Sequence, residues 1–219
     1  MGKKLTKRKK QSLRYPLNLY CEGQQEELYF ERLKVLINND SCNIKKIDYK
    51  PYNCGGSSSI VIVETAIRLC PGTQTPYIVF DHDLKERDFC KAIDLCLGKK
   101  GEMGYSNLNF DYFLVLHKCE GTPSVSTMYS NDAYEKQLKK LYGITKNEDI
   151  KQRSVIKKIV EQITIEDVKK AISKCYWIDD YNKNNRMPIN TPCGNHHFDN
   201  PDFTIHELVD KVIKNTLSK

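Results

Sequence analysis

Short apolar runs alternate with helical patterns through the first half of the chain. Runs typical of strands cover residues 17–21, 44–52 and 77–80. Apolar side chains recur at about 3.6-residue spacing over 29–37, 60–70 and 89–97, and 110–117 is apolar enough for a buried helix. Residues 103–106 form a short connecting segment. Strands alternating with helices predict an α/β fold with a mostly parallel sheet flanked by helices.

The second half of the chain has a different pattern. Three amphipathic stretches dense in Lys and Glu predict helices over 132–142, 150–162 and 165–176, and Thr164 and Asp167 have the spacing of a capping box. Residues 182–200 are polar and indicate a loop, and 205–217 is a final helix. The expected organisation is a basic arm over 1–14, an α/β core over 15–117, a helical insertion over 118–199, and a C-terminal segment over 200–219 that packs on the core.

Charge is concentrated at the N-terminus. The chain has 35 Lys and Arg against 28 Asp and Glu, for a net charge of +7. Residues 1–14 contain seven of these cations and no acid, so the remainder is neutral. Because residues 15–219 are neutral, a protein that coats nucleic acid over its whole surface is disfavoured. The basic arm is expected to bind either a nucleic-acid backbone or an acidic surface of a partner protein. The candidate contacts in this arm are Lys7, Arg8, Lys9 and Lys10.

No apolar run approaches the roughly 20 residues that span a bilayer, and no apolar segment follows the cationic start as in a secretory signal. The first six residues match a loose myristoylation pattern, but we expect no membrane anchor. Nine cysteines without a C-x-x-C pair indicate free thiols in a reducing cytoplasm.

Carboxylates follow two of the predicted strands. Glu22-Gly23 ends the first run, and Asp81-His82-Asp83 ends the third. The carboxyl ends of parallel strands lie at one edge of the sheet, where ligands bind. Mg²⁺ or Mn²⁺ makes such convergence of like charges favourable, so we predict a metal site at Glu22, Asp81 and Asp83. Glu26, in the first turn of the next helix, would serve a second cation. Solvated turn residues are the alternative reading of these acids.

The same segments carry a family resemblance. Glu22-Gly23 and Asp81-x-Asp83 look like the Toprim domain of primases, topoisomerases and overcoming-lysogenization-defect nucleases, and the spacing to Glu26 resembles the last of these. Residues 21–30, 79–83 and 105–117 resemble the RloB family more specifically. The resemblance covers 17–117 and about 197–215. It implies a Toprim-like, Rossmann-like core.

Family membership would also imply roles for further residues. The resemblance implies that Glu22, Asp81 and Asp83 bind the metal ion. Glu26 and Asp111 are supplementary acids, and Ser106 and Asn107 line the site. Asp111 stands where the family has Glu, so its side chain is one methylene shorter. Such proteins are found in bacterial anti-phage loci, often beside an AAA-type ATPase, and are thought to be effector nucleases.

The resulting hypothesis is a Mg²⁺-dependent nuclease that cleaves DNA or structured RNA such as tRNA. One alternative is a non-catalytic subunit that docks an AAA-type ATPase, and another is a phosphoryl- or nucleotidyl-transferring enzyme that uses the same metal site.

Other polar residues have two readings each. His82 is either a proton donor or phosphate contact, or an exposed turn residue, which we favour. His117 ends an apolar helix and is expected to be structural. Cys193-x-x-His196-His197 with Cys175 lacks a second well-placed cysteine, which disfavours zinc. Residues 55–59, Gly-Gly-Ser-Ser-Ser, fit a loop with an N-cap better than a phosphate cradle.

Overall fold

A computed structural model describes most of the chain. It covers residues 14–43, 45–56, 58–82, 85–107, 109–121, 131–185, 189–190, 196–197 and 201–217. The basic residues 7–10 of the predicted arm lie outside these ranges. Within them, no helix has the length and apolar character needed to cross a membrane. All eight cysteines of the described ranges are free thiols.

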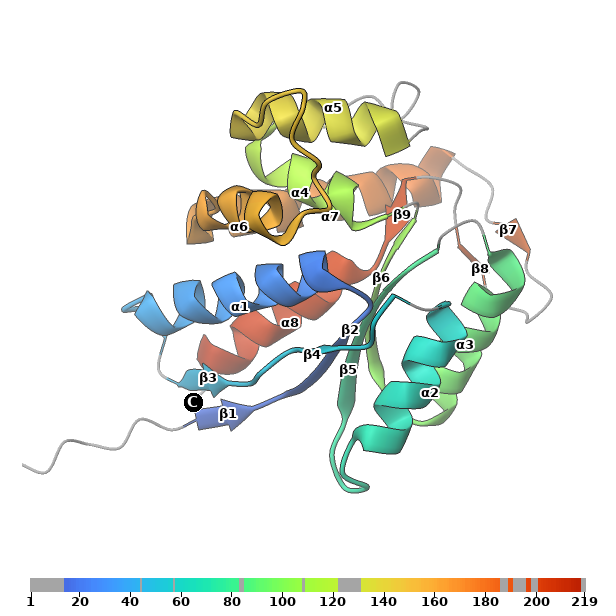
Figure 1. Cartoon of the computed structure of the whole chain (residues 1–219). Coiled ribbons are helices and arrows are strands. Elements are labelled where there is room, and N and C mark those ends of the chain that lie inside the picture. The colour runs from blue at the N-terminus through green and yellow to red at the C-terminus, as the bar shows by residue number, and fades with distance from the viewer. Residues whose placement is uncertain are drawn as a thin grey trace, which may run out of the picture.

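A five-stranded sheet forms the centre of the molecule (Figure 1). Its strand order is β4-β2-β5-β6-β9, in which β2, β4, β5 and β6 are parallel and β9 is antiparallel to β6. The predicted α/β class with a mostly parallel sheet is therefore confirmed. The strands are β2 (Asn18–Cys21), β4 (Tyr52–Asn53), β5 (Pro76–Asp81), β6 (Glu102–Asn107) and β9 (Asp202–Phe203). Two further pairs are β1 (Arg14–Pro16) with β3 (Lys46–Asp48), and β7 (Ile189–Asn190) with β8 (His196–His197).

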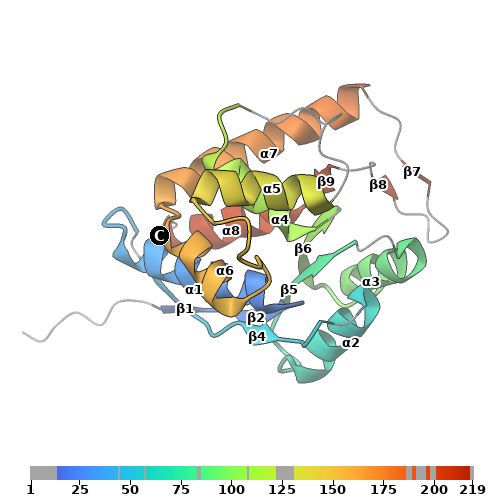
Figure 2. The same ribbon diagram turned by 45° about the horizontal axis from the view of Figure 1, so that its top comes forward.

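Helices cover both faces of this sheet. The helices α2 and α3 pack on one face, and α1 and α8 pack on the other (Figures 1 and 2). The remaining helices form an outer layer on the second side, with α5 and α7 against α4 and α6 against α1. The bounds are α1 (Gln24–Asn39), α2 (Ser59–Leu69), α3 (Glu86–Gly98), α4 (Phe110–Lys118), α5 (Asn131–Tyr142), α6 (Arg153–Glu161), α7 (Ile165–Asn185) and α8 (Ile205–Leu217).

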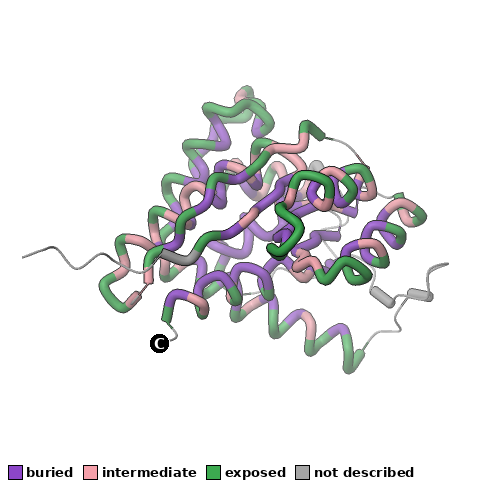
Figure 3. The backbone as a smooth tube through the Cα atoms, turned by 90° about the horizontal axis from the view of Figure 1, so that it is seen from below, coloured by how far each residue is buried: buried purple, intermediate pink, exposed green. Residues whose placement is uncertain are grey.

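The central strand β5 shows why its sequence is a continuous apolar run. Successive side chains of a strand point to opposite faces. Tyr77 and Val79 enter the core beneath α1 and α4, while Ile78 and Phe80 enter the core beneath α2 and α3. Both faces are covered, so no polar position is tolerated until Asp81 at the strand end. Figure 3 shows the same distribution, with buried backbone in the interior and exposed turns outside.

Several boundaries differ from the sequence prediction. The predicted strand over 44–52 is two short strands, β3 and β4, and the predicted connector 103–106 belongs to strand β6. A Cβ at Gly104 would lie 2.9 Å from Ile205 Cδ1, so a glycine in this strand allows α8 to approach closely. The third helix of the insertion continues to Asn185, into the predicted polar loop. The capping box is confirmed, since Thr164 N–H donates to Asp167 Oδ2 (2.9 Å) and Asp167 N–H donates to Thr164 Oγ1 (3.2 Å).

Candidate functional site

The ends of β2 and β5 lie side by side, as the parallel register requires. Cys21, the last residue of β2, pairs with Val79 of β5. The predicted acid Glu22 follows one residue after Cys21, and the predicted acid Asp81 ends β5 two residues after Val79. Asp81 N–H donates to Glu22 Oε2 at 2.8 Å, which fixes the Glu22 carboxylate across the strand pair. The two carboxylates therefore meet at the carboxyl edge of the sheet, where the sequence placed them.

The turn from β2 into α1 adds a third acid. Glu26, only 5% exposed, reaches back so that its Oε2 accepts a hydrogen bond of 3.0 Å from Gly23 N–H. A Cβ on residue 23 would lie 3.3 Å from that oxygen, so glycine leaves room for the carboxylate. The close packing of the Glu26 carboxylate over this turn thus explains why a glycine follows Glu22.

The first turn of α4 supplies the fourth acid. Phe110 N–H donates to Asp81 Oδ2 (3.2 Å), which ties this helix start to the end of β5. Asn109 caps the helix by accepting from Asp111 N–H (3.2 Å). Gln25 Nε2, on α1, donates to Asp111 Oδ1 (2.8 Å). Asp111 is thereby oriented toward the same space as the other three acids.

These carboxylates line one pocket of about 400 Å³. The wall opposite the sheet edge comes from the start of α6 and the residues just before it. The lining consists of Glu22, Gly23, Gln24, Gln25, Glu26, Gly56, Asp81, Asn109, Asp111, Ile150, Lys151 and Ile156. Four acids against one lysine give the lining an excess of negative charge, which a bound cation would offset.

Polar contacts with α1 hold α6 at this position. Arg32 of α1 donates to Ile163 O from Nε (3.1 Å) and Nη2 (2.9 Å), just beyond the end of α6. Arg153, the first residue of α6, forms an ion pair of 3.2 Å with Glu27. The helical stretch therefore completes the pocket that begins at the sheet edge.

The donor set fits Mg²⁺ or Mn²⁺. Every acidic group on the pocket wall offers oxygen, the ligand that these cations prefer, and no thiol or imidazole of the described residues lines it. One oxygen of each acid is already held by a backbone N–H or by Gln25. Carboxylates oriented in this way lose little conformational freedom when they bind a cation.

Burial raises the pKa of the Asp111 carboxyl above its usual value; the hydrogen bond from Gln25 and the charge of Lys151 act in the opposite direction. The folded state then binds more protons than the unfolded state between the two pKa values. Its free energy of unfolding falls as the pH rises through that window, and the loss persists at neutral pH. The ionised Asp111 therefore destabilises the protein when no cation is bound.

We expect Asp111→Asn to raise the midpoint of thermal unfolding at pH 7 in EDTA, because the amide removes the buried charge and keeps an oxygen for Gln25 Nε2. Mg²⁺ should stabilise the native protein more than the variant. Thermal scans at pH 3.5 provide the control, since the carboxyl is mostly protonated there in both states and the stability gain seen at pH 7 should become much smaller. A variant less stable than the native chain at pH 7 would contradict this electrostatic assignment.

The other predicted site residues are placed differently. Ser106 pairs with Asp81 across β5 and β6, and both Ser106 and Asn107 are buried at the strand end without lining the pocket. His82 is 7% exposed, so the expectation of an exposed turn residue is wrong. Its Nε2 lies 2.8 Å from Glu86 Oε2, and its ring contacts Phe89 edge-on with centroids 4.7 Å apart, which directs the imidazole toward α3. Asp83 lies outside the described residues.

Two further expectations concern residues away from the pocket. His117 is buried, with Nδ1 2.8 Å from Phe113 O and Nε2 3.1 Å from the Tyr29 hydroxyl, so its structural role is confirmed. Cys175 is buried in the main core. The side chains of its suggested zinc partners in 193–197 lie outside the described residues.

Sequence reasoning missed several members of the pocket. Asn109 was detectable, because Asn immediately before an apolar helix is an N-cap signal. Gly56 has a positive φ of 65° and donates its N–H to Glu22 O at 2.9 Å, so the glycine-rich loop packs against the acidic turn. Lys151, Ile150 and Ile156 had no local signal, since only the packing of α6 on α1 brings them to the pocket.

Comparisons with known proteins give one match. The profile of the family described as RloB-like protein matches residues 18–212. A search of curated proteins returns no match. No solved structure matches the chain either.

Proposed function

Because the chain belongs to the RloB-like family and places four acids in one pocket at the carboxyl edge of its sheet, we propose that it is a metal-dependent nuclease. The observation that carries the proposal is the convergence of Glu22, Glu26, Asp81 and Asp111 from two strand ends and two helix starts. Such a charge set is costly to build unless a cation compensates it. Substrates would be nucleic-acid phosphodiesters, either RNA such as tRNA or DNA.

Each residue has a proposed part in this chemistry. Glu22 and Asp81 are the central metal ligands, together with Asp83, and Glu26 and Asp111 hold a second cation or the water of the first. A bound Mg²⁺ would neutralise phosphate charge and promote ionisation of the attacking water. Lys151 would bind a substrate phosphate at the pocket wall, and the arm residues 7–10 would add salt-sensitive affinity for the polyanion. The resemblance to anti-phage proteins makes an effector role in defence, regulated by an AAA-type ATPase, part of the proposal.

The test is cleavage by the purified protein of tRNA, single-stranded DNA and plasmid, each with Mg²⁺, with Mn²⁺ and with EDTA. We expect cleavage of one of these substrate classes in either cation and none in EDTA. Transfer of a phosphoryl group to an acceptor without chain cleavage would favour the transferase alternative. Absence of cleavage from every substrate, with and without a co-purified ATPase partner, would support the non-catalytic subunit.

Lys151→Ala should raise KM for nucleic acid, because this exposed cation is the lysine on the pocket wall. Loss of one phosphate contact should also reduce the slope of log(kcat/KM) against log[salt] by about 1. Lys157→Ala is the matched control, since Lys157 lies on α6, which begins two residues after Lys151, but pairs with the exposed Glu161 (3.7 Å). Equal effects of the two substitutions would show that Lys151 contributes only general surface charge.

A further inference from the structure

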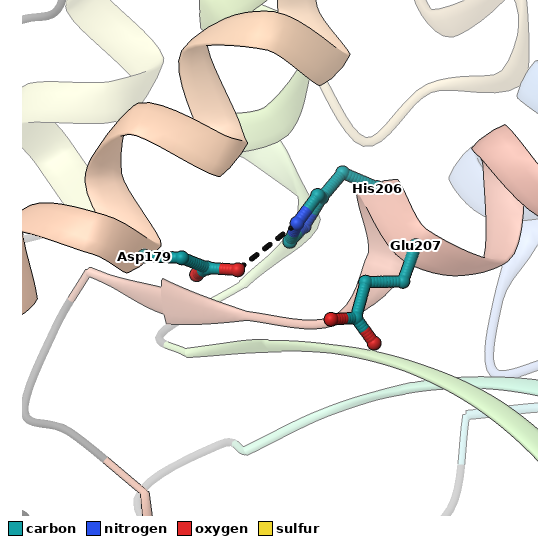
Figure 4. Close-up of side chains that lie close together, drawn as sticks. All are labelled: Asp179, His206 and Glu207. Carbon is teal, nitrogen blue, oxygen red and sulfur yellow. Dashed lines mark ion pairs between the residues drawn. The ribbon is translucent and has the colours of Figure 1, made fainter. Parts of the chain in front are cut away.

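A second cluster of polar side chains lies between α7 and α8, outside the acidic pocket. Asp179 comes from α7, and His206 and Glu207 come from the first turn of α8. One ligand atom of each residue lies within 4.8 Å of those of the other two. In Figure 4, the imidazole points toward the Asp179 carboxylate, and Glu207 projects beside them from the same helix turn as His206.

His206 is fully buried and poorly satisfied. Its ring packs edge-on against Tyr176 and Phe203, with centroids 4.7 and 5.6 Å away. Nε2 lies 3.0 Å from Asp179 Oδ2, but neither ring nitrogen forms a well-aligned hydrogen bond within the described part of the chain. Buried polar atoms nearly always have such a partner, so this imidazole is placed for a contact that the described residues do not supply.

The surroundings of His206 are strongly negative. Asp202, 5% exposed, accepts a hydrogen bond of 3.0 Å from the Tyr105 hydroxyl. Burial raises the pKa of Tyr105, and the charges of Asp202, Asp179 and Glu207 raise it further. Among the described residues, no lysine or arginine pairs with Asp179 or Glu207. Several carboxylates around one imidazole favour a site for positive charge.

We propose that Asp179, His206 and Glu207 bind a divalent transition-metal ion of the Zn²⁺ type. One imidazole nitrogen with two carboxylate oxygens suits Zn²⁺, whereas Mg²⁺ prefers oxygen alone. Three protein ligands leave a fourth tetrahedral position for water or a further ligand. Bound there, the ion joins α7 to α8 and thereby holds β9, which lies between them in the chain, at the edge of the sheet.

The experiment uses Co²⁺ as a spectroscopic substitute for Zn²⁺ in the full-length Glu22→Gln, Asp81→Asn protein, which lacks the central ligands of the acidic pocket. We expect one Co²⁺ per chain with a visible spectrum of nitrogen and oxygen ligands and no thiolate charge-transfer band. Adding Glu207→Gln should weaken Co²⁺ and Zn²⁺ binding at least tenfold, in line with losses seen when metal sites are perturbed. The side chain of Glu207 is exposed, so this substitution leaves the core intact.

Asp180→Asn is the matched control, because Asp180 is exposed and adjacent to Asp179 in the chain. It should leave binding unchanged, whereas His206→Gln should abolish binding. Binding that survives Glu207→Gln and His206→Gln, a thiolate band, or no saturable binding would each overturn the proposal and reduce the cluster to an ion pair between two helices. Since the acidic pocket is already disabled, these results are independent of the proposed nuclease activity.

Discussion

Asp81→Asn is expected to reduce nucleic-acid cleavage by at least about a hundredfold, the upper range for loss of a group that merely supports a metal ligand. The carboxylate lies at the end of β5, between Glu22 and the start of α4. The amide has nearly the same shape, and its oxygen can still accept from Phe110 N–H. Its charge is absent, so the pocket should hold a divalent cation less tightly while the strand end keeps its structure. Cleavage rates at saturating substrate over a range of Mg²⁺ concentrations measure the effect.

Glu102→Gln is the control for this substitution. Glu102 also lies on a central strand, but at the amino end of β6, where it is paired with Lys211. The Glu102→Gln variant should cleave nucleic acid at the native rate, and both variants should have the circular dichroism spectrum of the native protein. If Asp81→Asn retained full activity at every Mg²⁺ concentration, or if both variants lost activity equally, the pocket would not be the catalytic site.

Glu22 and Asp81 were predictable because each follows an apolar run. Glu22 and Asp81 terminate strands buried on both faces, and parallel topology places such ends at one edge. Asp111 was expected only from the family resemblance, since an acid in the first turn of an apolar helix is also explained by the helix dipole. The structure brings it to the pocket through Gln25 and Asn109.

The cationic side of the pocket could not be read from local sequence. Lys151 stands among many lysines of the helical stretch, and its position depends on contacts more than a hundred residues apart, such as Arg32 with Ile163 O and Arg153 with Glu27. The missed strand β6 has the same kind of cause. In the sequence, Gly104 and Ser106 have the composition of a connecting loop. In the structure they belong to a strand, because Ile205, about a hundred residues later, packs on the glycine. Long-range packing decided both features.

The burial of His82 could not be predicted from the sequence for a different reason. A histidine between two acids at a strand end has the composition of an exposed turn. Residue 86, one helical turn later, is a glutamate that lies 2.8 Å from the imidazole, and Phe89 covers the ring. Partners spaced at four and seven residues were visible in the sequence, but the backbone turn that directs the ring toward them was not.

Acidification is expected to destabilise the protein between about pH 6.5 and pH 4 through His117. Burial lowers the pKa of this imidazole from 6.5 to about 4. Its ring packs edge-on against Tyr29 and Phe113. Nδ1–H donates to Phe113 O, and Nε2 accepts from the Tyr29 hydroxyl. Both nitrogens are used by the neutral form, so a second proton would break the bond from Tyr29 and place a charge in the core.

The direction in which stability changes with pH follows from proton uptake by the folded and unfolded states. The unfolded chain takes up the proton near pH 6.5, whereas the folded protein resists it until about pH 4, so the free energy of unfolding falls as the pH decreases through this window. The difference between these two pKa values corresponds to roughly 3 kcal/mol of stability that is present at neutral pH and lost below pH 4. Urea unfolding at pH 7.5, 5.5 and 4.5 measures the decline.

His117→Gln isolates this contribution, because the amide oxygen can accept from Tyr29 but the side chain does not titrate. The variant should be less stable than the native protein at pH 7.5, since the shorter, differently shaped side chain fills the aromatic cluster less well. Its stability should depend less steeply on pH between 6.5 and 4, and the two curves should converge on acidification. Asp111 and the other carboxylates titrate in both proteins and cancel in the difference. Parallel curves would mean that His117 takes up its proton at the same pH in the folded and unfolded states. In the protonated folded form, the hydrogen bond with Tyr29 would then have to run in the opposite direction.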